Sequence, residues 1–575
     1  MLKLFRQLRP FAGMIAGVLV LVFIQSMSDL YLPTLMSDII DTGVVKGDTN
    51  YILRIGALML LIAAIGAACS VVASYFSSKA AMGFGKQLRK RVFSRVEAFS
   101  LQEFDKIGTA SLITRTTNDI TQVQQVLVML MRMVLSAPIM FVGGVIMAVT
   151  KDAKLSLVIV AIIPILALTI FLVMSKGLPL FKVMQTKLDT LNLILREGLM
   201  GVRVVRAFNR DPYEQKRFET ANYDFMSVSI RVNKIMAYMM PVMMLIFNLT
   251  TVAILWFGGL RVDTGSMQVG DLMAFMQYVT QIMFALIMAS MMFIMVPRAA
   301  ASAARINEVL DMEPSIVDAD VTATADENCG DLEFDRVTFH YPDAQMPALS
   351  DISFRAKPGQ VTAIIGGTGA GKSTLVNLIP RFYDIDAGEI RIGGVNIQKM
   401  KQTELRSKIG FVPQKAVLFS GTIRENIRYG KEDATDEEII HAAQIAQAAG
   451  FIEQMEEGYE SIIAQGGTNL SGGQKQRLSI ARALVRKPEL YIFDDSFSAL
   501  DFKTDAKLRS ALKIETVDRA VLIVAQRVST VLHADQIIVL DEGKVEDIGT
   551  HEQLLERCGV YREIVASQLS EEESA

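Results

Sequence analysis

The strongest candidate for chemistry is a glycine-rich loop in the second half of the chain. The loop comprises Gly366, Gly367, Thr368, Gly369, Ala370, Gly371, Lys372, Ser373 and Thr374. An apolar run at residues 361–365 predicts a strand before it, and a helix is expected after it, which is the setting of a phosphate-binding P-loop. Glycines let backbone N–H groups wrap around phosphates, Lys372 would neutralise the β- and γ-phosphates, and Ser373 would ligate Mg²⁺. The sequence therefore predicts a magnesium-dependent nucleotide site.

A carboxylate for the same site follows a second apolar run. Residues 490–493 predict a strand, and Asp494 comes directly after it. A carboxylate at that place holds Mg²⁺ through water in P-loop ATPases. Asp494 is therefore predicted to share the metal with Ser373.

The segment between these motifs carries a resemblance to a family. Leu470-Ser471-Gly472-Gly473-Gln474 opens a predicted helix, and this pentapeptide resembles the signature of ABC transporters. In that family each ATP lies between the P-loop of one subunit and the signature of the other. The resemblance implies that residues 471–474 contact the ATP held by a partner subunit, through a hydroxyl and N–H groups at a helix N-terminus.

Other positions match the family in the same order along the chain. The resemblance implies that Tyr341 stacks on adenine and that Gln414 contacts both Mg²⁺ and the membrane domain. It also identifies residues 498–501 as the D-loop, ending in Asp501, and residues 419–426 as the segment that receives the coupling helices. ATP and Mg²⁺ are thus the implied ligands.

Two positions of this site depart from the family pattern. A Glu usually follows the metal-binding Asp and orients the attacking water, but here Asp495 stands there. Its side chain is about 1.5 Å shorter, enough to misplace a carboxylate that must reach its water. Gln526 replaces the histidine that steadies the γ-phosphate, and residues 464–467 replace the usual Gly-Glu-Arg-Gly. Gln414 is the third catalytic position and matches the family pattern. Asp495 and Gln526 predict a degenerate site that binds ATP but hydrolyses it slowly.

An intact signature beside a degenerate site is found in one subunit of heterodimeric exporters of this family. The resemblance therefore implies a second half-transporter that carries the usual Glu and His. A homodimer with an atypical working site is the alternative.

The other half of the chain has the composition of a membrane domain. Six runs of at least 18 residues lack Asp, Glu, Lys and Arg, and at about 1.5 Å per residue each crosses most or all of a ~30 Å hydrocarbon core. They are residues 11–28, 55–78, 133–150, 155–175, 235–260 and 272–297. Connections 38–51, 151–154 and 261–271 are short and poor in Lys and Arg, whereas residues 79–132 and 176–234 are rich in them. This asymmetry predicts that the latter two segments and both termini are cytoplasmic.

Segments 108–119 and 197–208 make this half resemble the membrane domain of ABC exporters. The fold expected is an all-α six-helix transmembrane domain (1–310), a linker (311–330), and an α/β P-loop nucleotide-binding domain with a helical subdomain (331–575). The resemblance implies a multi-pass protein of the plasma membrane in contact with the lipid bilayer.

Overall composition agrees with a membrane location. The chain is 51% hydrophobic, and its mean hydropathy is +0.34. A formal net charge of −3 gives no footprint for nucleic acid, so no such partner is expected. Cys69, Cys329 and Cys558 lie far apart, without the spacing of metal ligands.

Methionines recur in the last two predicted spans, and flexible thioethers suit a surface that accepts several ligand shapes. They are Met239, Met240, Met243 and Met244, then Met288, Met291 and Met295 with Phe284. Cavity lining and ordinary packing both remain open for them. Polar residues in and beside the spans are open in the same way. Asp29 marks a path or a paired interior site, or lies at the outer interface, and Asn248, Gln277 and Gln281 line a path or bond between helices, whereas Arg132 is expected to snorkel to the cytoplasmic headgroups.

Function follows from these parts as an expectation. The family resemblance predicts an ATP-driven exporter subunit for a small amphipathic substrate, either drug-like or lipid-like. Open alternatives are a nucleotide-regulated subunit, an importer with the exporter fold, and a lipid or peptide transporter. A soluble ATPase of translation or repair is disfavoured by the six spans.

Overall fold

The computed structural model describes residues 2–318, 330–342 and 344–572, with all their side chains except those of residues 2, 290, 291, 293, 294 and 569–572. The chain divides into two compact units. The helical unit is Met1–Glu97 with Ala110–Met312, and the sheet unit is Ala98–Thr109 with Glu313–Ala575. Most of the predicted linker, and Cys329, lie outside the described residues.

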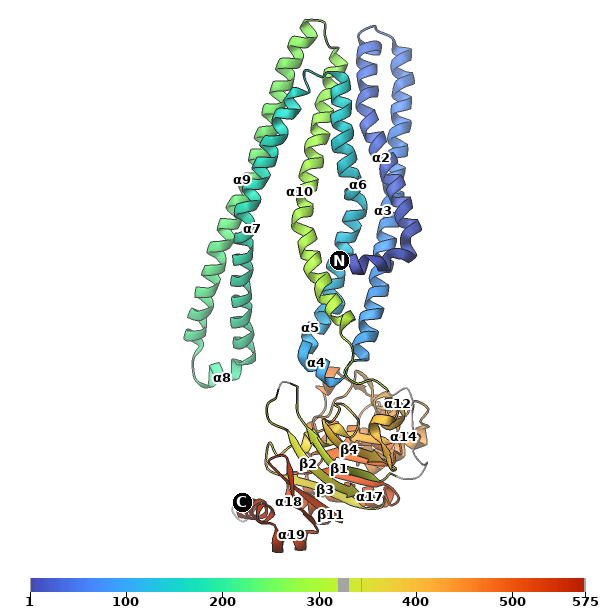
Figure 1. The fold of residues 1–575 in the computed structure, drawn as a ribbon, viewed down its shortest axis with the longest axis vertical. Coiled ribbons are helices and arrows are strands. Elements are labelled where there is room, and N and C mark those ends of the chain that lie inside the picture. The colour runs from blue at the N-terminus through green and yellow to red at the C-terminus, as the bar shows by residue number, and fades with distance from the viewer. Residues whose placement is uncertain (1, 319–329, 343, 573–575) are drawn as a thin grey trace. The chain divides into compact units, whose positions relative to one another are not determined.

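Six long helices dominate the helical unit and confirm the six predicted spans (Figure 1). They are α2 (Ala12–Asp38), α3 (Thr49–Glu97), α6 (Ile120–Lys151), α7 (Leu157–Met200), α9 (Asp211–Asp263) and α10 (Val269–Asp311). The unit also has short elements: α1 (Leu2–Phe5), α5 (Thr109–Thr114), α8 (Val202–Ala207) and single turns at Arg6–Phe11, Ile39–Val44 and Arg115–Asp119. Since α3, α7 and α9 hold 49, 44 and 53 residues, each is far longer than the ~20 residues a bilayer needs.

Within this unit, α6 packs on α10 and α2 packs on α3, while α7 and α9 form an antiparallel pair joined by α8 (Figure 1). The apolar stripe of α10 supplies the centre, where Phe275 and Tyr278 are fully buried. The Tyr278 hydroxyl lies 2.6 Å from the Thr34 hydroxyl, so its polar end is satisfied inside the bundle.

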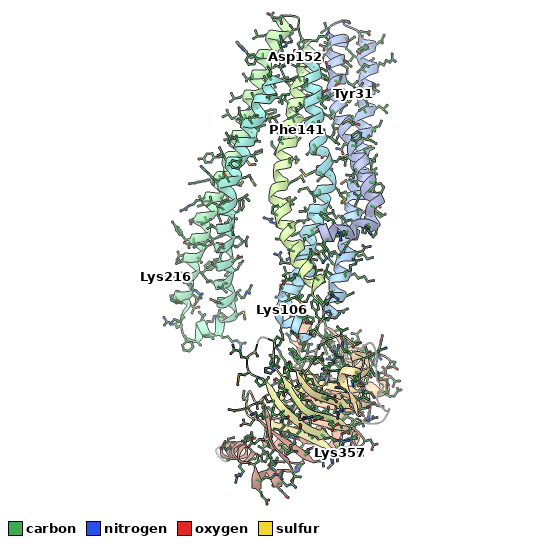
Figure 2. All side chains as sticks on the ribbon, viewed as in Figure 1. Tyr31, Lys106, Phe141, Asp152, Lys216 and Lys357 are labelled. Carbon is green, nitrogen blue, oxygen red and sulfur yellow. The ribbon has the colours of Figure 1, made fainter. Side chains whose placement is uncertain are left out.

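Several helices extend into the segments that the sequence predicted to be connecting loops. Residues 38–51 and 261–271 were expected to be loops, but the chain is helical up to Val44, again from Thr49, and up to Asp263. Contacts between distant residues accompany these longer helices: Ser37 Oγ donates to Asp271 Oδ1 at 2.8 Å, Lys151 Nζ lies 2.6 Å from Asp271 Oδ1, and Arg261 pairs with Asp152. Figure 2 shows Asp152 at that end of the unit and Lys216 towards the other. Charged residues therefore mark the edge of the hydrocarbon without ending the helices.

The sheet unit is built on a six-stranded sheet in the order β12-β11-β3-β10-β9-β6, parallel except for β12. A four-stranded antiparallel sheet, β2-β1-β4-β5, and the pair β7-β8 complete the strands. The bounds are β1 (Leu332–Phe339), β2 (Leu349–Ala356), β3 (Val361–Gly366), β4 (Ala387–Ile392), β5 (Val395–Asn396), β6 (Ile409–Val412), β7 (Gly421–Thr422), β8 (Ile462–Ile463), β9 (Leu490–Asp494), β10 (Ala520–Val524), β11 (Gln536–Asp541) and β12 (Lys544–Gly549).

Helices cover this sheet and form the expected helical subdomain around α13, α14 and α16. They are α4 (Leu101–Ile107), α11 (Lys372–Leu378), α12 (Gln402–Ser407), α13 (Ile423–Arg428), α14 (Asp436–Ile445), α15 (Ala449–Ile452), α16 (Gly472–Leu484), α17 (Phe502–Glu515), α18 (Val528–Val531), α19 (His551–Arg557) and α20 (Gly559–Glu572), with single turns at Ile397–Lys399, Gly458–Glu460 and Gln465–Gly467. Strands β3, β9 and β10 are almost fully buried, as adjacent parallel strands covered on both faces must be. The carboxyl ends of β3 and β9 deliver the candidate site.

Candidate nucleotide site

The P-loop leaves the end of β3 and enters α11. Gly369 and Gly371 have φ angles of +87° and +95°, which L-residues with side chains adopt at a cost. A Cβ on Gly371 would lie 2.8 Å from Leu349 Cδ2 and 3.0 Å from the Ala348 carbonyl oxygen. A Cβ on Gly367 or Gly369 would meet nothing within 4 Å, so the inner wall of the loop is open. The loop thus has the shape of a phosphate cradle.

Lys372 places its charge inside this loop. Its Nζ donates to the carbonyl oxygens of Gly366 and Gly367, both at 2.7 Å, and the side chain is buried. Burial lowers the pKa of the ammonium group, although the nearby Asp495 and Asp494 carboxylates act in the opposite direction. Phosphate oxygens would give this cation a stronger partner than neutral carbonyls.

Ser373 and Asp494 meet across the site, with the Ser373 hydroxyl donating to Asp494 Oδ1 at 3.2 Å. Asp494 is buried at the end of β9, and burial raises the pKa of its carboxyl, partly offset by the Ser373 hydrogen bond. A hydroxyl beside a desolvated carboxylate is the hard-oxygen donor set that Mg²⁺ prefers. The residues present therefore fit the predicted metal.

Asp495 follows in a constrained backbone conformation. Its φ is +46°, in the left-handed region that residues other than glycine rarely adopt. The Asp495 N–H donates to the Val524 carbonyl at 3.0 Å, and Oδ2 accepts from Gln414 Nε2 at 3.2 Å. Burial raises the pKa of this carboxyl too. The structure thus brings Asp494, Asp495, Gln414 and the P-loop together and ties the short side chain of Asp495 to Gln414.

Gln526 lies exposed just after β10. Its carbonyl oxygen accepts from Gln568 Nε2 at 2.8 Å, and Gln568 Oε1 accepts from the Val528 N–H at 2.7 Å. One side chain of α20 therefore fixes the backbone of residues 526–528. Sequence reasoning missed Gln568, because a glutamine in an amphipathic helix carries no signal of such a contact.

Tyr341 lies beside the P-loop helix with its ring partly exposed. Its hydroxyl is 3.0 Å from Thr374 Oγ1, and its ring packs edge-on against Phe339 and Tyr383. An exposed, laterally supported ring suits stacking on a flat base. Tyr383, which sequence reasoning also missed, donates from its hydroxyl to Asp105 Oδ2 of α4 at 2.9 Å, and burial raises the pKa of that hydroxyl.

The signature segment is a helix cap. The Ser471 hydroxyl accepts from the Gln474 N–H at 3.3 Å, and Gln474 Oε1 accepts from the Ser471 N–H at 2.9 Å, so α16 begins at Gly472. Among the residues that the structure describes, no hydrogen bond or ion pair joins this segment to the P-loop. The predicted contact with a partner's ATP therefore stays a prediction.

The D-loop lies against the signature. A Cβ on Gly473 would come 3.1 Å from the Ala499 carbonyl oxygen, which leaves little room for a side chain. Asp501 ends the D-loop as the cap of α17, where its Oδ1 accepts from the Thr504 N–H at 2.9 Å.

The methionines of the two last spans divide between packing and cavity. Met243 is buried in the helical core, and Met239 packs against it. Met240 and Met244 are exposed, whereas Met288 and Phe284 line a cavity between α6 and α10. Met295 is not among the residues that line it, and the Met291 side chain lies outside those described. Of the polar residues in the spans, Gln281 donates to the Asp29 carbonyl at 3.0 Å, an interhelical bond.

Comparison with known proteins matches both units. The protein-family model for the ABC transporter transmembrane region matches residues 15–286, and the family model for the ABC transporter domain matches residues 349–498. A protein of Mycobacterium tuberculosis (strain CDC 1551 / Oshkosh), described as an uncharacterised ABC transporter ATP-binding protein, is 43% identical over 99% of this chain and 98% of its own length. The ATP-dependent lipid A-core flippase of Syntrophus aciditrophicus (strain SB) is 31% identical over 99% and 94%. A solved structure of a bacterial Atm1-family ABC exporter with ATP bound aligns with a TM-score of 0.81 and 26% identity, over 97% of this chain and 98% of that one.

Proposed function

Because the chain belongs to the ABC transporter family and is an exporter half-transporter, we propose that it is the degenerate-site subunit of a heterodimeric ATP-driven exporter. Its own site binds ATP with Mg²⁺ and hydrolyses it slowly. Its signature completes the active site of a partner that carries the usual Glu and His. The assembly lies in the plasma membrane with both termini in the cytoplasm.

The observation that carries this proposal is the pair of substitutions Asp495 and Gln526 beside intact binding machinery. The Asp495 carboxylate is one methylene short of the usual Glu, and Gln414 holds it by a hydrogen bond. A carboxylate that must orient water loses most of its effect when displaced by about 1 Å. Gln526 cannot act as the histidine would, because an amide does not carry a positive charge.

The other residues of the site have roles in binding. Lys372 and the P-loop N–H groups hold the phosphates, Tyr341 supports the adenine, and Ser373, Asp494 and Gln414 hold the metal. Mg²⁺ would neutralise charge on the phosphates when bound. Because these residues are retained, this site should bind ATP tightly.

Transport follows from the coupling of the two units. ATP binding would draw two nucleotide domains together and move the six spans from inward- to outward-facing, and hydrolysis in the partner's site would reset them. An amphipathic drug or a lipid-like molecule is the substrate class proposed. The resemblance to a protein named as a lipid A-core flippase supports the lipid-like member of this class.

A gain-of-function substitution tests the degenerate site. Asp495→Glu with Gln526→His should raise steady-state ATP turnover of the purified assembly several-fold, because it restores both reach and charge. Asp535→Glu with Gln398→His, the same exchanges outside the site, is the matched control. Unchanged turnover in the first variant, with ATP still bound, would reject the geometric argument.

Vesicle assays separate the transporter from its alternatives. ATP-dependent accumulation of a fluorescent amphiphile in inside-out vesicles supports export. Passive conductance that responds to nucleotide without accumulation would indicate a regulated channel, and ATP-driven release from the same vesicles would indicate import.

A further inference from the structure

A cavity of about 560 Å³ lies between α6 and α10 in the helical unit. Its described lining consists of one stripe of α6 (Gln125, Val128, Met129, Arg132, Met133, Ser136, Ala137 and Met140) and one of α10 (Gln281, Phe284, Ala285 and Met288). Both stripes follow helical spacing, so each helix turns a single face towards the cavity. The volume lies within the range of sites for drug-sized ligands.

Arg132 is the one charged residue among those described lining residues. No hydrogen bond or ion pair engages its guanidinium within the part of the chain that the structure describes. It directly precedes the charge-free run 133–150, and therefore lies at the edge of the hydrocarbon. A guanidinium at that edge reaches water and the headgroup layer along its own apolar stem, so it stays charged and is available to an anion that enters the cavity.

The other described lining residues carry no charge, and only Gln125, Ser136 and Gln281 among them are polar. Met129, Met133, Met140 and Met288 contribute soft thioethers, and Phe284 contributes a ring. A second, apolar cavity of about 380 Å³ adjoins the first through Met133, Ala137 and Ala285, and continues along α6 to Phe141. Figure 2 shows Phe141 part-way along the unit, towards the end that carries Asp152. The two cavities thus overlap along α6 from Met133 to Met140, the first with Arg132 in its lining and the second lined by apolar residues that reach Phe141.

We propose that these two cavities bind an amphiphile with an anionic head, a carboxylate, sulfate or phosphate, which Arg132 engages through its planar guanidinium while the tail extends past Met133 towards Phe141. The inference deepens the proposed function, on which it rests, by giving the substrate a charge and an orientation. Arginine suits this role because its fork of donors matches a carboxylate or phosphate and stays charged at every physiological pH.

The anion could belong to a membrane lipid or to a free amphiphile, and binding measurements distinguish the two. We use the purified full-length assembly in nanodiscs of phosphatidylcholine, without ATP. Two pairs of NBD-labelled probes are titrated: dodecanoate against the neutral dodecanamide, and short-chain phosphatidylglycerol against short-chain phosphatidylcholine. The variants are Arg132→Gln and Arg132→Lys, with Arg298→Gln as a control that removes an arginine of α10 outside the cavity lining.

The native assembly should bind at least one anionic probe about 10-fold more tightly than its uncharged or zwitterionic partner, the gain expected of a charge-assisted pair. Arg132→Gln should abolish that preference while still binding the neutral probe, Arg132→Lys should keep part of it, and Arg298→Gln should keep all of it. Preference within the phospholipid pair assigns the anion to a lipid, and preference within the dodecanoate pair assigns it to a free amphiphile.

Equal binding of charged and uncharged probes by the native assembly would overturn the proposal, as would a preference that survives in Arg132→Gln. If Arg132→Gln binds no probe at all, the Arg132→Lys variant decides: a preference for the anionic probe that it keeps in part supports the proposal, and equal binding of the two probes overturns it. Because binding is read without ATP, it is independent of the proposed division of hydrolysis. An intact preference without ATP-driven accumulation would reject the transport function and keep the site.

Discussion

Asp495 illustrates how the backbone and one methylene act together at the residue scale. Its positive φ and its hydrogen bond to the Val524 carbonyl fix where the side chain starts, and Gln414 fixes where it ends. The neighbouring Asp494 instead points to Ser373. Two consecutive aspartates thus have different surroundings: Asp494 lies beside the Ser373 hydroxyl, and Asp495 accepts from the side-chain amide of Gln414.

Ser471 is predicted to act on ATP held by the partner. Ser471→Ala should lower turnover of the assembly by about 100-fold, the usual effect of removing a donor to developing charge. The substitution also removes a helix cap worth about 1 kcal/mol. Thr435→Ala is the matched control, because Thr435 caps α14 with the same geometry outside the nucleotide site. Equal turnover in the two variants would count against action across subunits.

At the scale of elements, contacts between segments far apart in the sequence position the nucleotide site. Tyr383 joins an aromatic group around the adenine-side residue Tyr341 to Asp105 of α4, within the sheet unit. Tyr383→Phe keeps the ring and removes the hydrogen bond. We expect ATP turnover to persist and the amount transported per ATP to fall several-fold. Tyr459→Phe is the control, because the buried Tyr459 hydroxyl has no hydrogen-bond partner among the described residues. If Tyr383→Phe transports the same amount of substrate per ATP, the hydrogen bond from Tyr383 to α4 does not contribute to the coupling of hydrolysis to transport.

Gln568 links α20 to the loop after β10. Gln568→Ala should free the Val528 N–H, and its amide hydrogen should exchange roughly 10-fold faster, since each lost bond costs about 1 kcal/mol. Glu563→Ala, on an exposed position of the same helix, has the same helix propensity change and should leave the exchange as it is. Identical exchange rates in both variants would show that the loop after β10 keeps its conformation without the hydrogen bonds of Gln568.

The sequence predicted these elements unevenly, for physical reasons. The six spans depend on local composition and are confirmed, whereas the nucleotide-binding roles of the P-loop and Asp494, read from equally local patterns, stay predictions. The ends of α2 and α9 could not be predicted, because the contacts beside them join distant residues, Ser37 with Asp271 and Arg261 with Asp152. Tyr383 and Asp105 are 278 residues apart, and Gln526 and Gln568 are 42 apart, so no local pattern could pair them.

The asymmetry becomes a property of the assembly at the scale of the whole molecule. In the proposed heterodimer this chain would contribute its P-loop to one ATP and its signature to the other, so a defect at Asp495 would affect only the first. In the helical unit, Arg132 is the one charged residue among the described lining residues of the cavity between α6 and α10.

The most direct measurement is steady-state ATP hydrolysis by this polypeptide assembled only with copies of itself, compared with the mixed assembly from its native membrane. Both should bind ATP equally well at this chain's site. The mixed assembly should hydrolyse it at an ordinary rate and the homomeric one at least 10-fold more slowly, since every site would then carry Asp495 and Gln526. Rapid hydrolysis by the homomeric assembly would contradict the division of labour proposed.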